Sequence, residues 1–184
     1  MKKTPTVLVP LAPGFEEIEA MTIIDVLRRA GYDAITAGTI SGPITGAHGV
    51  IVTPDCVITD VDASALRMVV LPGGLPGATN LKDNATVISL LQHVHASGGI
   101  AAAMCAAPMA LGKAGLAKGR RVTCYPGFED QLTGGTCVTD RVVEDDRVVT
   151  SRGPGTAMEF SLALVASLGD PAKSAALRSG MLVG

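Results

Sequence analysis

Cys105 lies between two segments of different character, a position that suits nucleophilic chemistry. The preceding run Ile100–Met104 is apolar and of strand length, and the following run Ala106–Leu116 has a helical pattern. We expect the dipole of the following helix to favour the thiolate, which is the reactive form of the side chain. The alternative is a buried structural cysteine, because free cysteine is among the most buried residue types. This segment alone leaves both interpretations open.

Three glutamates, Glu16, Glu17 and Glu19, stand at the beginning of a predicted helix over about Phe15–Gly31. Acidic side chains in a first turn complement the helix dipole. The apolar stripe of this helix is bordered by both Glu16 and Glu19, so either side chain could point inward. Periodicity does not choose between the two.

The pair Gly73-Gly74 comes shortly after the predicted buried strand Met68–Leu71. Two glycines there leave backbone N–H groups open at close range, which is what an oxyanion near an attacking sulfur requires. Glycine pairs are also common in ordinary turns, so a plain turn is the alternative interpretation.

Apolar runs of strand length alternate with helical patterns along the chain, which predicts a parallel sheet with helices on both faces. The expected strands are Thr6–Leu11, Asp33–Gly38, Met68–Leu71, Ile100–Met104 and Arg121–Cys124. The expected helices are about Phe15–Gly31, Ala85–Ala96, Ala106–Leu116, a helix from Pro154 to about Leu168, and a last one that Asp170-Pro171 begins. The predicted fold class is therefore a doubly wound α/β sandwich, and we expect residues 1–184 to form a single domain.

Two further segments, Ile44–Thr53 and Arg141–Ser151, predict β-hairpins, the second with its turn at Asp145-Asp146. We expect both hairpins to lie at the edges of the sheet.

Ligands of open α/β sheets bind beyond the carboxyl ends of the strands, where the strand order reverses. The glutamate segment follows the strand that ends at Leu11, the glycine pair follows the strand that ends at Leu71, and Cys105 directly follows Met104. We therefore expect these three loops to converge on one site.

The composition narrows the class of partner. The chain of 184 residues is 47% hydrophobic and 17% charged with a formal net charge of -2, which argues against disorder and against strong nucleic-acid binding. Its four cysteines form no CxxC pair, so we expect free thiols in a reducing compartment. Prolines at Pro5, Pro10 and Pro13 interrupt the first apolar stretch, and no run approaches a membrane span, so a cytoplasmic location is expected.

Four motifs together resemble the DJ-1/ThiJ/PfpI superfamily, in particular the branch of the parkinsonism-associated deglycase and its bacterial relatives. They are Leu11–Ala20, Leu71–Gly74, Cys105–Pro108 and Thr150–Thr156. The match runs in register over nearly the whole chain. The resemblance implies a flavodoxin-like fold, a homodimer, and a cysteine held on a nucleophile elbow.

The resemblance also implies roles for the candidate residues. Glu19 matches a family glutamate that is protonated and hydrogen-bonds the thiolate, here that of Cys105, and so serves as the acid and base. Two adjacent anions would repel, so the pair would share one proton. The backbone at Gly73 and Gly74 matches the family's oxyanion donors, with Ala106 as a further contributor.

Two positions depart from the family pattern. Tyr125 stands where many members have a histidine, and His48 stands where the closest relatives have an arginine. We expect both near the pocket, as substrate-binding groups. Tyrosine can donate a hydrogen bond, but its ordinary pKa of about 10 makes it a poor base at neutral pH.

The remaining motifs argue against other chemistries. No histidine follows His95, which argues against a Cys-His hydrolase. His93 and His95 are two residues apart on a predicted helix and point to different sides, so we expect no metal site. The turn at Gly73–Gly77 lacks the lysine of a phosphate loop and the spacing of a dinucleotide fingerprint, so no cofactor is expected.

The function implied is that of a cofactor-independent glyoxalase or deglycase with a Cys105 nucleophile and a Glu19 acid/base. Its substrates would be methylglyoxal-type dicarbonyls or their early adducts with protein or nucleotide amines. The alternative is an oxidative-stress sensor or redox-regulated chaperone in which Cys105 is oxidised rather than catalytic.

Overall fold

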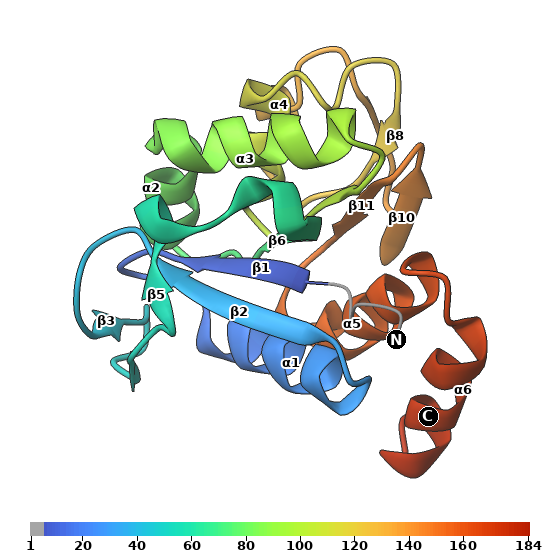
Figure 1. Cartoon of the computed structure of the whole chain (residues 1–184). Coiled ribbons are helices and arrows are strands. Elements are labelled where there is room, and N and C mark those ends of the chain that lie inside the picture. The colour runs from blue at the N-terminus through green and yellow to red at the C-terminus, as the bar shows by residue number, and fades with distance from the viewer. Residues whose placement is uncertain (1–5) are drawn as a thin grey trace.

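A seven-stranded sheet forms the centre of the structure, a computed structural model that describes residues 6–184 (Figure 1). The strands follow the order β10-β11-β7-β6-β1-β2-β5, and β10 alone among these pairs antiparallel with its neighbour. Their bounds are β1 Thr6–Leu11, β2 Asp33–Gly38, β5 Cys56–Val57, β6 Leu66–Leu71, β7 Ile100–Met104, β10 Val142–Asp145 and β11 Val148–Ser151. The order reverses between β1 and β6, which confirms the predicted doubly wound sheet.

Helices cover both faces of this sheet, with α2, α3 and α4 on one side and α1 and α5 on the other (Figure 1). Their bounds are α1 Glu17–Arg29, α2 Gly77–Asp83, α3 Ala85–Ala96, α4 Pro108–Lys113, α5 Ala157–Ser167 and α6 Pro171–Gly180. Because helices lie over both faces, every residue of β1 and β7 is buried, as in parallel sheets generally. Within residues 6–184, no helix has both the length and the apolar character needed to cross a membrane.

Several elements have the predicted bounds, and four predictions need correction. The strands Thr6–Leu11, Asp33–Gly38 and Ile100–Met104 and the helix Ala85–Ala96 are confirmed residue for residue. The segment Arg121–Cys124 is no strand of the main sheet. Its first two residues form β8 (Arg121–Val122), which pairs with β9 (Thr136–Cys137) in a separate two-stranded sheet.

The predicted hairpin over Ile44–Thr53 exists, as β3 (Ile44–Thr45) and β4 (Ile51–Val52), but it is not an edge of the main sheet. It is held instead at the beginning of α1, because Glu17 Oε1 accepts hydrogen bonds from the backbone N–H of His48 at 2.7 Å and of Val50 at 3.3 Å. Of the three prolines noted in the N-terminal stretch, Pro5 lies outside the residues that the structure describes.

The second predicted hairpin is confirmed as β10 and β11, although only β10 is an edge, because β11 pairs with β7. Its turn is formed by Asp146 and Arg147, one residue later than predicted, and both have positive φ (44° and 62°), as tight hairpin turns require. Helix α2 was not predicted, because its seven residues bury only Gly77, Ala78 and Leu81 and so give too short a pattern to detect.

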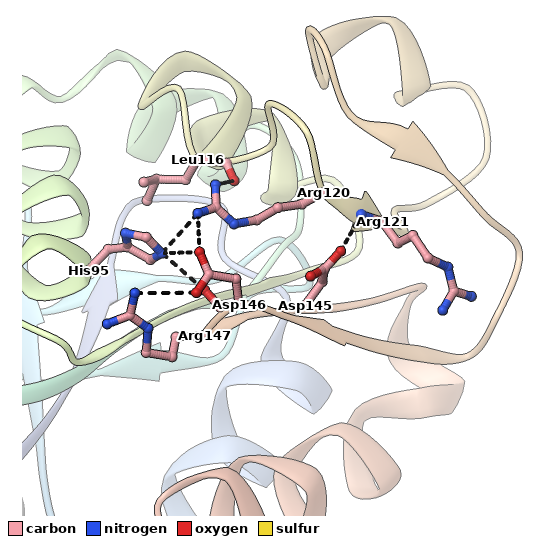
Figure 2. Close-up of polar contacts among 7 residues, drawn as sticks. All are labelled: His95, Leu116, Arg120, Arg121, Asp145, Asp146 and Arg147. Atoms are coloured by element: carbon pink, nitrogen blue, oxygen red, sulfur yellow. Dashed lines mark hydrogen bonds and ion pairs between the residues drawn. The ribbon is translucent and has the colours of Figure 1, made fainter.

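A polar cluster joins three elements at the amino-terminal ends of β7 and β11 (Figure 2). The guanidinium of Arg120 binds the carboxylate of Asp146 and donates to the carbonyl of Leu116 at 3.0 Å. His95 Nε2 lies 3.1 Å from the Asp146 carbonyl oxygen, and Arg147 donates to the Asp146 carboxylate at 3.3 Å. These contacts tie the end of α3 and the approach to β8 to the turn between β10 and β11. They stabilise the end of the sheet at which β7 and β11 begin, opposite the carboxyl ends of the parallel strands.

Candidate active site

Cys105 occupies a strained turn directly after β7. Its φ is 61°, in the left-handed region that non-glycine residues seldom adopt, and strain of that kind persists only where the surroundings fix it. The surroundings here are two backbone hydrogen bonds: Cys105 N–H donates to the Ser151 carbonyl at 2.9 Å, and its own carbonyl accepts from Tyr125 N–H at 2.8 Å. The turn confirms the predicted change from strand to helix at this cysteine.

Glu19 points inward from the first turn of α1 and is fully buried. Its Oε2 accepts a hydrogen bond from Gly73 N–H at 2.7 Å, while its Oε1 has no hydrogen-bond partner within residues 6–184. The Gly73 N–H, predicted as an oxyanion donor, is thus already used by the carboxyl group. Of the two glutamates that periodicity left open, Glu19 is the one that faces the cysteine.

Gly73 is the point of closest approach between the two functional groups. A Cβ at this position would lie 2.6 Å from Cys105 Cβ, 2.8 Å from Glu19 Oε2 and 3.1 Å from Cys105 Sγ. Any side chain would therefore force the carboxyl group and the sulfur apart. The strand end that carries Gly73 brings the glutamate and the cysteine together because it lacks a side chain.

Glu19 and Cys105 hold one proton between them near neutral pH. Burial raises the pKa of Glu19 to about 7, against the opposing hydrogen bonds from Gly73 and Cys105. Burial and the negative charge of Glu19 raise the pKa of Cys105 to about 12, against hydrogen bonds from the backbone N–H of Gly74 and Ala106. Because the two groups interact, these values describe the pair: it gives up its first proton near pH 7 and its second toward pH 12, and the proton held in between can lie on either group.

The expected lowering of the Cys105 pKa by the following helix is therefore wrong. That helix, α4, begins only at Pro108 and has six residues. Burial and Glu19 outweigh its dipole, so any thiolate depends on the shared proton rather than on the helix.

A cavity of about 260 Å³ opens over Cys105. Its lining is mostly apolar and consists of Glu16, Gly74, Leu75, Cys105, Ala106, Tyr125, Phe128 and Pro154. Tyr125 is half-exposed and stands at the rim. A cavity of this size and polarity accommodates a molecule of a few carbon atoms beside the sulfur.

Comparison with known proteins establishes the family. The sequence profile described as the DJ-1/PfpI family matches residues 5–167. The chain belongs to the DJ-1/PfpI family. Drosophila melanogaster Protein dj-1beta is 40% identical over 179 residues, which cover 96% of each chain. The crystal structure of Drosophila melanogaster DJ-1beta superposes with a TM-score of 0.93 over 99% of this chain and 100% of that one, at 40% identity.

Two further relatives of this family differ in how much of them the chain covers. The Glutathione-independent glyoxalase DJR-1.2 of Caenorhabditis elegans is 38% identical over 164 residues, 88% of this chain and 87% of that protein. Protein DJ-1 homolog A of Arabidopsis thaliana is 41% identical over 169 residues, 90% of this chain. The match spans only 43% of that longer protein.

His48, the second departure from the family pattern, lies on the hairpin between β3 and β4 and is not among the residues that line the cavity. Its Nδ1 is 2.9 Å from Glu17 Oε2 and 3.5 Å from Glu16 Oε2. The hydrogen bond with Glu17, and then the charges of Glu16 and Glu17, raise the pKa of this histidine. In the described chain its contacts fasten the hairpin to α1.

The same three residues, Glu16, Glu17 and His48, place potential metal-ligand atoms within 4.8 Å of one another. A divalent cation could be held there by two carboxylates and an imidazole. Their existing hydrogen bond and ion pairs already account for the arrangement, so the expectation of no metal stays a prediction.

The sequence analysis did not name the apolar walls of the cavity, Leu75, Phe128 and Pro154. None of these side chains carries chemistry of its own. Leu75 stood in the turn Gly73–Gly77 and Pro154 in the motif Thr150–Thr156, and their positions after β6 and β11 could have indicated their place at the site.

Proposed function

We propose that this member of the DJ-1/PfpI family is a glutathione-independent glyoxalase that acts on methylglyoxal-type dicarbonyls. One observation carries the proposal: a fully buried carboxyl group, that of Glu19, lies against a cysteine on a strained turn, and burial raises the pKa of this group to about 7. A nucleophile with a proton carrier beside it is the equipment that an internal redox isomerisation of a dicarbonyl needs. The name of the Caenorhabditis elegans relative supports the same substrate class.

The reaction would begin when the Cys105 thiolate adds to the aldehyde carbon, forming a C–S bond and an alkoxide. The N–H groups of Gly74 and Ala106, which hydrogen-bond the sulfur, are the donors available to this developing charge. Protonated Glu19 gives its proton to the alkoxide and becomes the base of the next step.

The carboxylate of Glu19 then removes the proton from the former aldehyde carbon, and an enediolate forms with its negative charge on the oxygen of the neighbouring carbon. Glu19 returns that proton to the neighbouring carbon, the hydroxyl proton of the first carbon passes to the neighbouring oxygen, and a thioester of Cys105 results. Water cleaves the thioester to a 2-hydroxy acid and restores the thiolate, so methylglyoxal and one water become lactate with no external oxidant or reductant.

A carbonyl already attached to an amine would follow the same steps and release the amine, which is the deglycase activity. Glycated proteins or nucleotides would then be substrates as well. The predicted homodimer and the cytoplasmic location stay predictions.

The test is steady-state conversion of methylglyoxal to lactate in thiol-free buffer, by the wild type and by Cys105→Ser. Loss of the nucleophile is expected to lower kcat by at least roughly 10³-fold, since a serine hydroxyl has no comparable anionic form at neutral pH. Circular dichroism of both proteins controls for folding. A wild type that makes no lactate, or a serine variant that matches it, would refute the proposal.

A redox-sensing role for Cys105 is the second candidate. Cys105 is 9% exposed and lines the cavity, and a Toxoplasma gondii DJ-1 structure, 35% identical to this chain, is described as oxidized. The two functions separate in Glu19→Ala, which loses turnover if Glu19 is the acid/base but retains any holdase activity toward an aggregating client.

A further inference from the structure

A second cavity, also of about 260 Å³, adjoins the catalytic one. Its lining is formed by Tyr125, Pro126, Arg141, Arg152, Gly153, Pro154, Gly155 and Thr156. Tyr125 and Pro154 line both cavities, so the two spaces meet across these side chains. The Tyr125 ring is fixed there against Gly153, where a Cβ would lie 3.2 Å from its Cδ2.

Arg152 lines this second cavity and, like Cys105, directly follows the carboxyl end of a strand of the sheet. Strand β11 pairs with β7 so that Ser151 lies opposite Met104. Arg152 directly follows Ser151, and Cys105 directly follows Met104. The hydrogen bond from Cys105 N–H to the Ser151 carbonyl, 2.9 Å long, holds these strand ends side by side. A ligand that reaches from one cavity into the other would therefore touch both residues.

Of the two arginines in this lining, only Arg152 has a free charge. Arg141 donates to the carboxylate of Glu159 at 2.7 Å and to the Gly155 carbonyl at 2.9 Å. Arg152 makes no hydrogen bond and no ion pair with any residue of 6–184. Burial raises the pKa of Cys124 to about 12 and the positive charge of Arg152 opposes that rise, so the guanidinium lies near Cys124, the residue directly before Tyr125.

The charges of the two cavities differ in sign. The catalytic cavity is lined by Glu16 and adjoins Glu19, and the described residues that line it include no cationic side chain, so an anionic group on a ligand finds no partner there. The outer cavity offers an unpaired guanidinium, a planar group that binds carboxylate or phosphate oxygens through two parallel hydrogen bonds. A substrate with one carbonyl end and one anionic end is thus oriented with the carbonyl at Cys105.

We propose that Arg152 is a specificity-determining residue that binds the carboxylate or phosphate of an anionic dicarbonyl, whose aldehyde reacts at Cys105. The inference deepens the proposed function and rests on it for the chemistry at the sulfur. Methylglyoxal has no anionic group and does not reach the outer cavity, so its turnover is independent of Arg152.

The test compares three 2-oxoaldehydes: 4,5-dioxopentanoate, 2-oxo-3-phosphooxypropanal and the neutral methyl ester of the first. Arg152→Gln is expected to lower kcat/KM for at least one of the two anionic compounds by about tenfold or more, and to leave the ester and methylglyoxal within about twofold. The anionic compound whose kcat/KM falls shows whether Arg152 binds a carboxylate or a phosphate. Arg121→Gln is the matched control, because it removes the same charge from an exposed arginine that pairs with Asp140 and lies outside both cavities.

Equal effects of Arg152→Gln on the anionic compounds and on the ester would overturn the proposal. So would an unchanged preference for the anionic compounds in this variant. A second measurement separates this failure from failure of the proposed function: binding of 4,5-dioxopentanoate and of the phosphate compound to Cys105→Ser, by calorimetry. Binding of either that weakens about tenfold on adding Arg152→Gln supports the subsite even where no lactate is formed, and binding of both that is indifferent to Arg152 contradicts it.

Discussion

Two clusters of polar residues lie at opposite ends of the parallel strands: one surrounds Asp146, and the other is Glu19 with Cys105. They shift the pKa of their carboxyl groups in opposite directions. At the amino-terminal ends of β7 and β11, the carboxylate of Asp146 is bound by Arg120 and Arg147, and these contacts lower its pKa (Figure 2). At the carboxyl-terminal edge, Glu19 has no cation beside it, and burial raises its pKa to about 7.

The difference shows how one fold separates stability from reactivity. A carboxylate paired with arginines stays ionised at neutral pH and serves as a tie between elements. A carboxyl group buried next to Cys105, with Glu19 Oε1 left without a partner in the described chain, keeps its proton into the neutral range and can exchange it. Acid/base chemistry is therefore expected at the second cluster and not at the first.

The largest expected effect is on turnover in Glu19→Gln, which keeps the shape of the side chain but cannot give or take a proton. We expect kcat for methylglyoxal to fall by roughly 10²–10⁴-fold, the usual contribution of general acid–base catalysis. Asp146→Asn is the matched change in the other cluster and should leave kcat within about twofold. Comparable losses in the two variants would break the distinction between the clusters.

Gly73→Ala tests the close approach of the two functional groups. The new Cβ would lie 2.8 Å from Glu19 Oε2 and 2.6 Å from Cys105 Cβ, so the pair must separate. We expect kcat/KM to fall by roughly 10²-fold, as for a displacement of about 1 Å in a catalytic group. Gly180→Ala is the control, since a Cβ there meets no atom within 4 Å and Gly180 lines neither cavity. If both variants keep wild-type kcat/KM, the contact at Gly73 is irrelevant to catalysis.

The raised pKa of Glu19 predicts a loss of stability as the pH rises. The unfolded chain releases this proton near 4.5, whereas the folded pair releases its first proton only near 7, so the folded state binds more protons between these values. The free energy of unfolding therefore falls by about 3 kcal/mol across that interval. Urea unfolding from pH 4 to pH 8 should show this fall in the wild type and not in Glu19→Gln; parallel curves for the two proteins would contradict it.

Asp146 predicts a smaller effect of opposite sign. Its folded pKa lies below the ordinary 3.8, so its contribution to stability is present above that value and is lost as the pH falls through the folded pKa. Asp146→Asn should lower the urea midpoint at pH 7, and the gap to the wild type should close in strong acid. A gap that widens on acidification would show that the pairing with Arg120 does not stabilise the fold.

The parts of the fold that could be predicted are those in which local pattern and tertiary environment agree. Strands β1, β2 and β7 are buried runs with turn residues at their ends, so their bounds follow from the sequence. The segment Arg121–Cys124 has the same apolar character, but only tertiary contacts decide which sheet a short run joins. The hairpin over Ile44–Thr53 does not join the main sheet for a similar reason. A hydrogen bond to Glu17, which is distant in the sequence, holds it at the beginning of α1.

The site divides in the same way. Position after a strand predicted Cys105, Gly73 and Gly74, because the topology places the carboxyl ends of parallel strands at one edge. The choice of Glu19 over Glu16 needed the resemblance, because a helical stripe has two borders. The use of Gly73 N–H by the carboxyl group could not be foreseen, since it depends on a backbone direction that no sequence pattern encodes.

We infer that Cys105 is a thiolate at neutral pH because Glu19 holds the remaining proton of the pair. The most direct measurement is the ultraviolet absorbance of the thiolate as a function of pH, taken as the difference between the wild type and Cys105→Ser. A Cys105-dependent rise centred near pH 7 is expected, because the pair gives up its first proton there and the sulfur then carries the charge. A rise that appears only toward pH 12 would mean that Glu19 ionises while the thiol stays protonated, and would refute this inference.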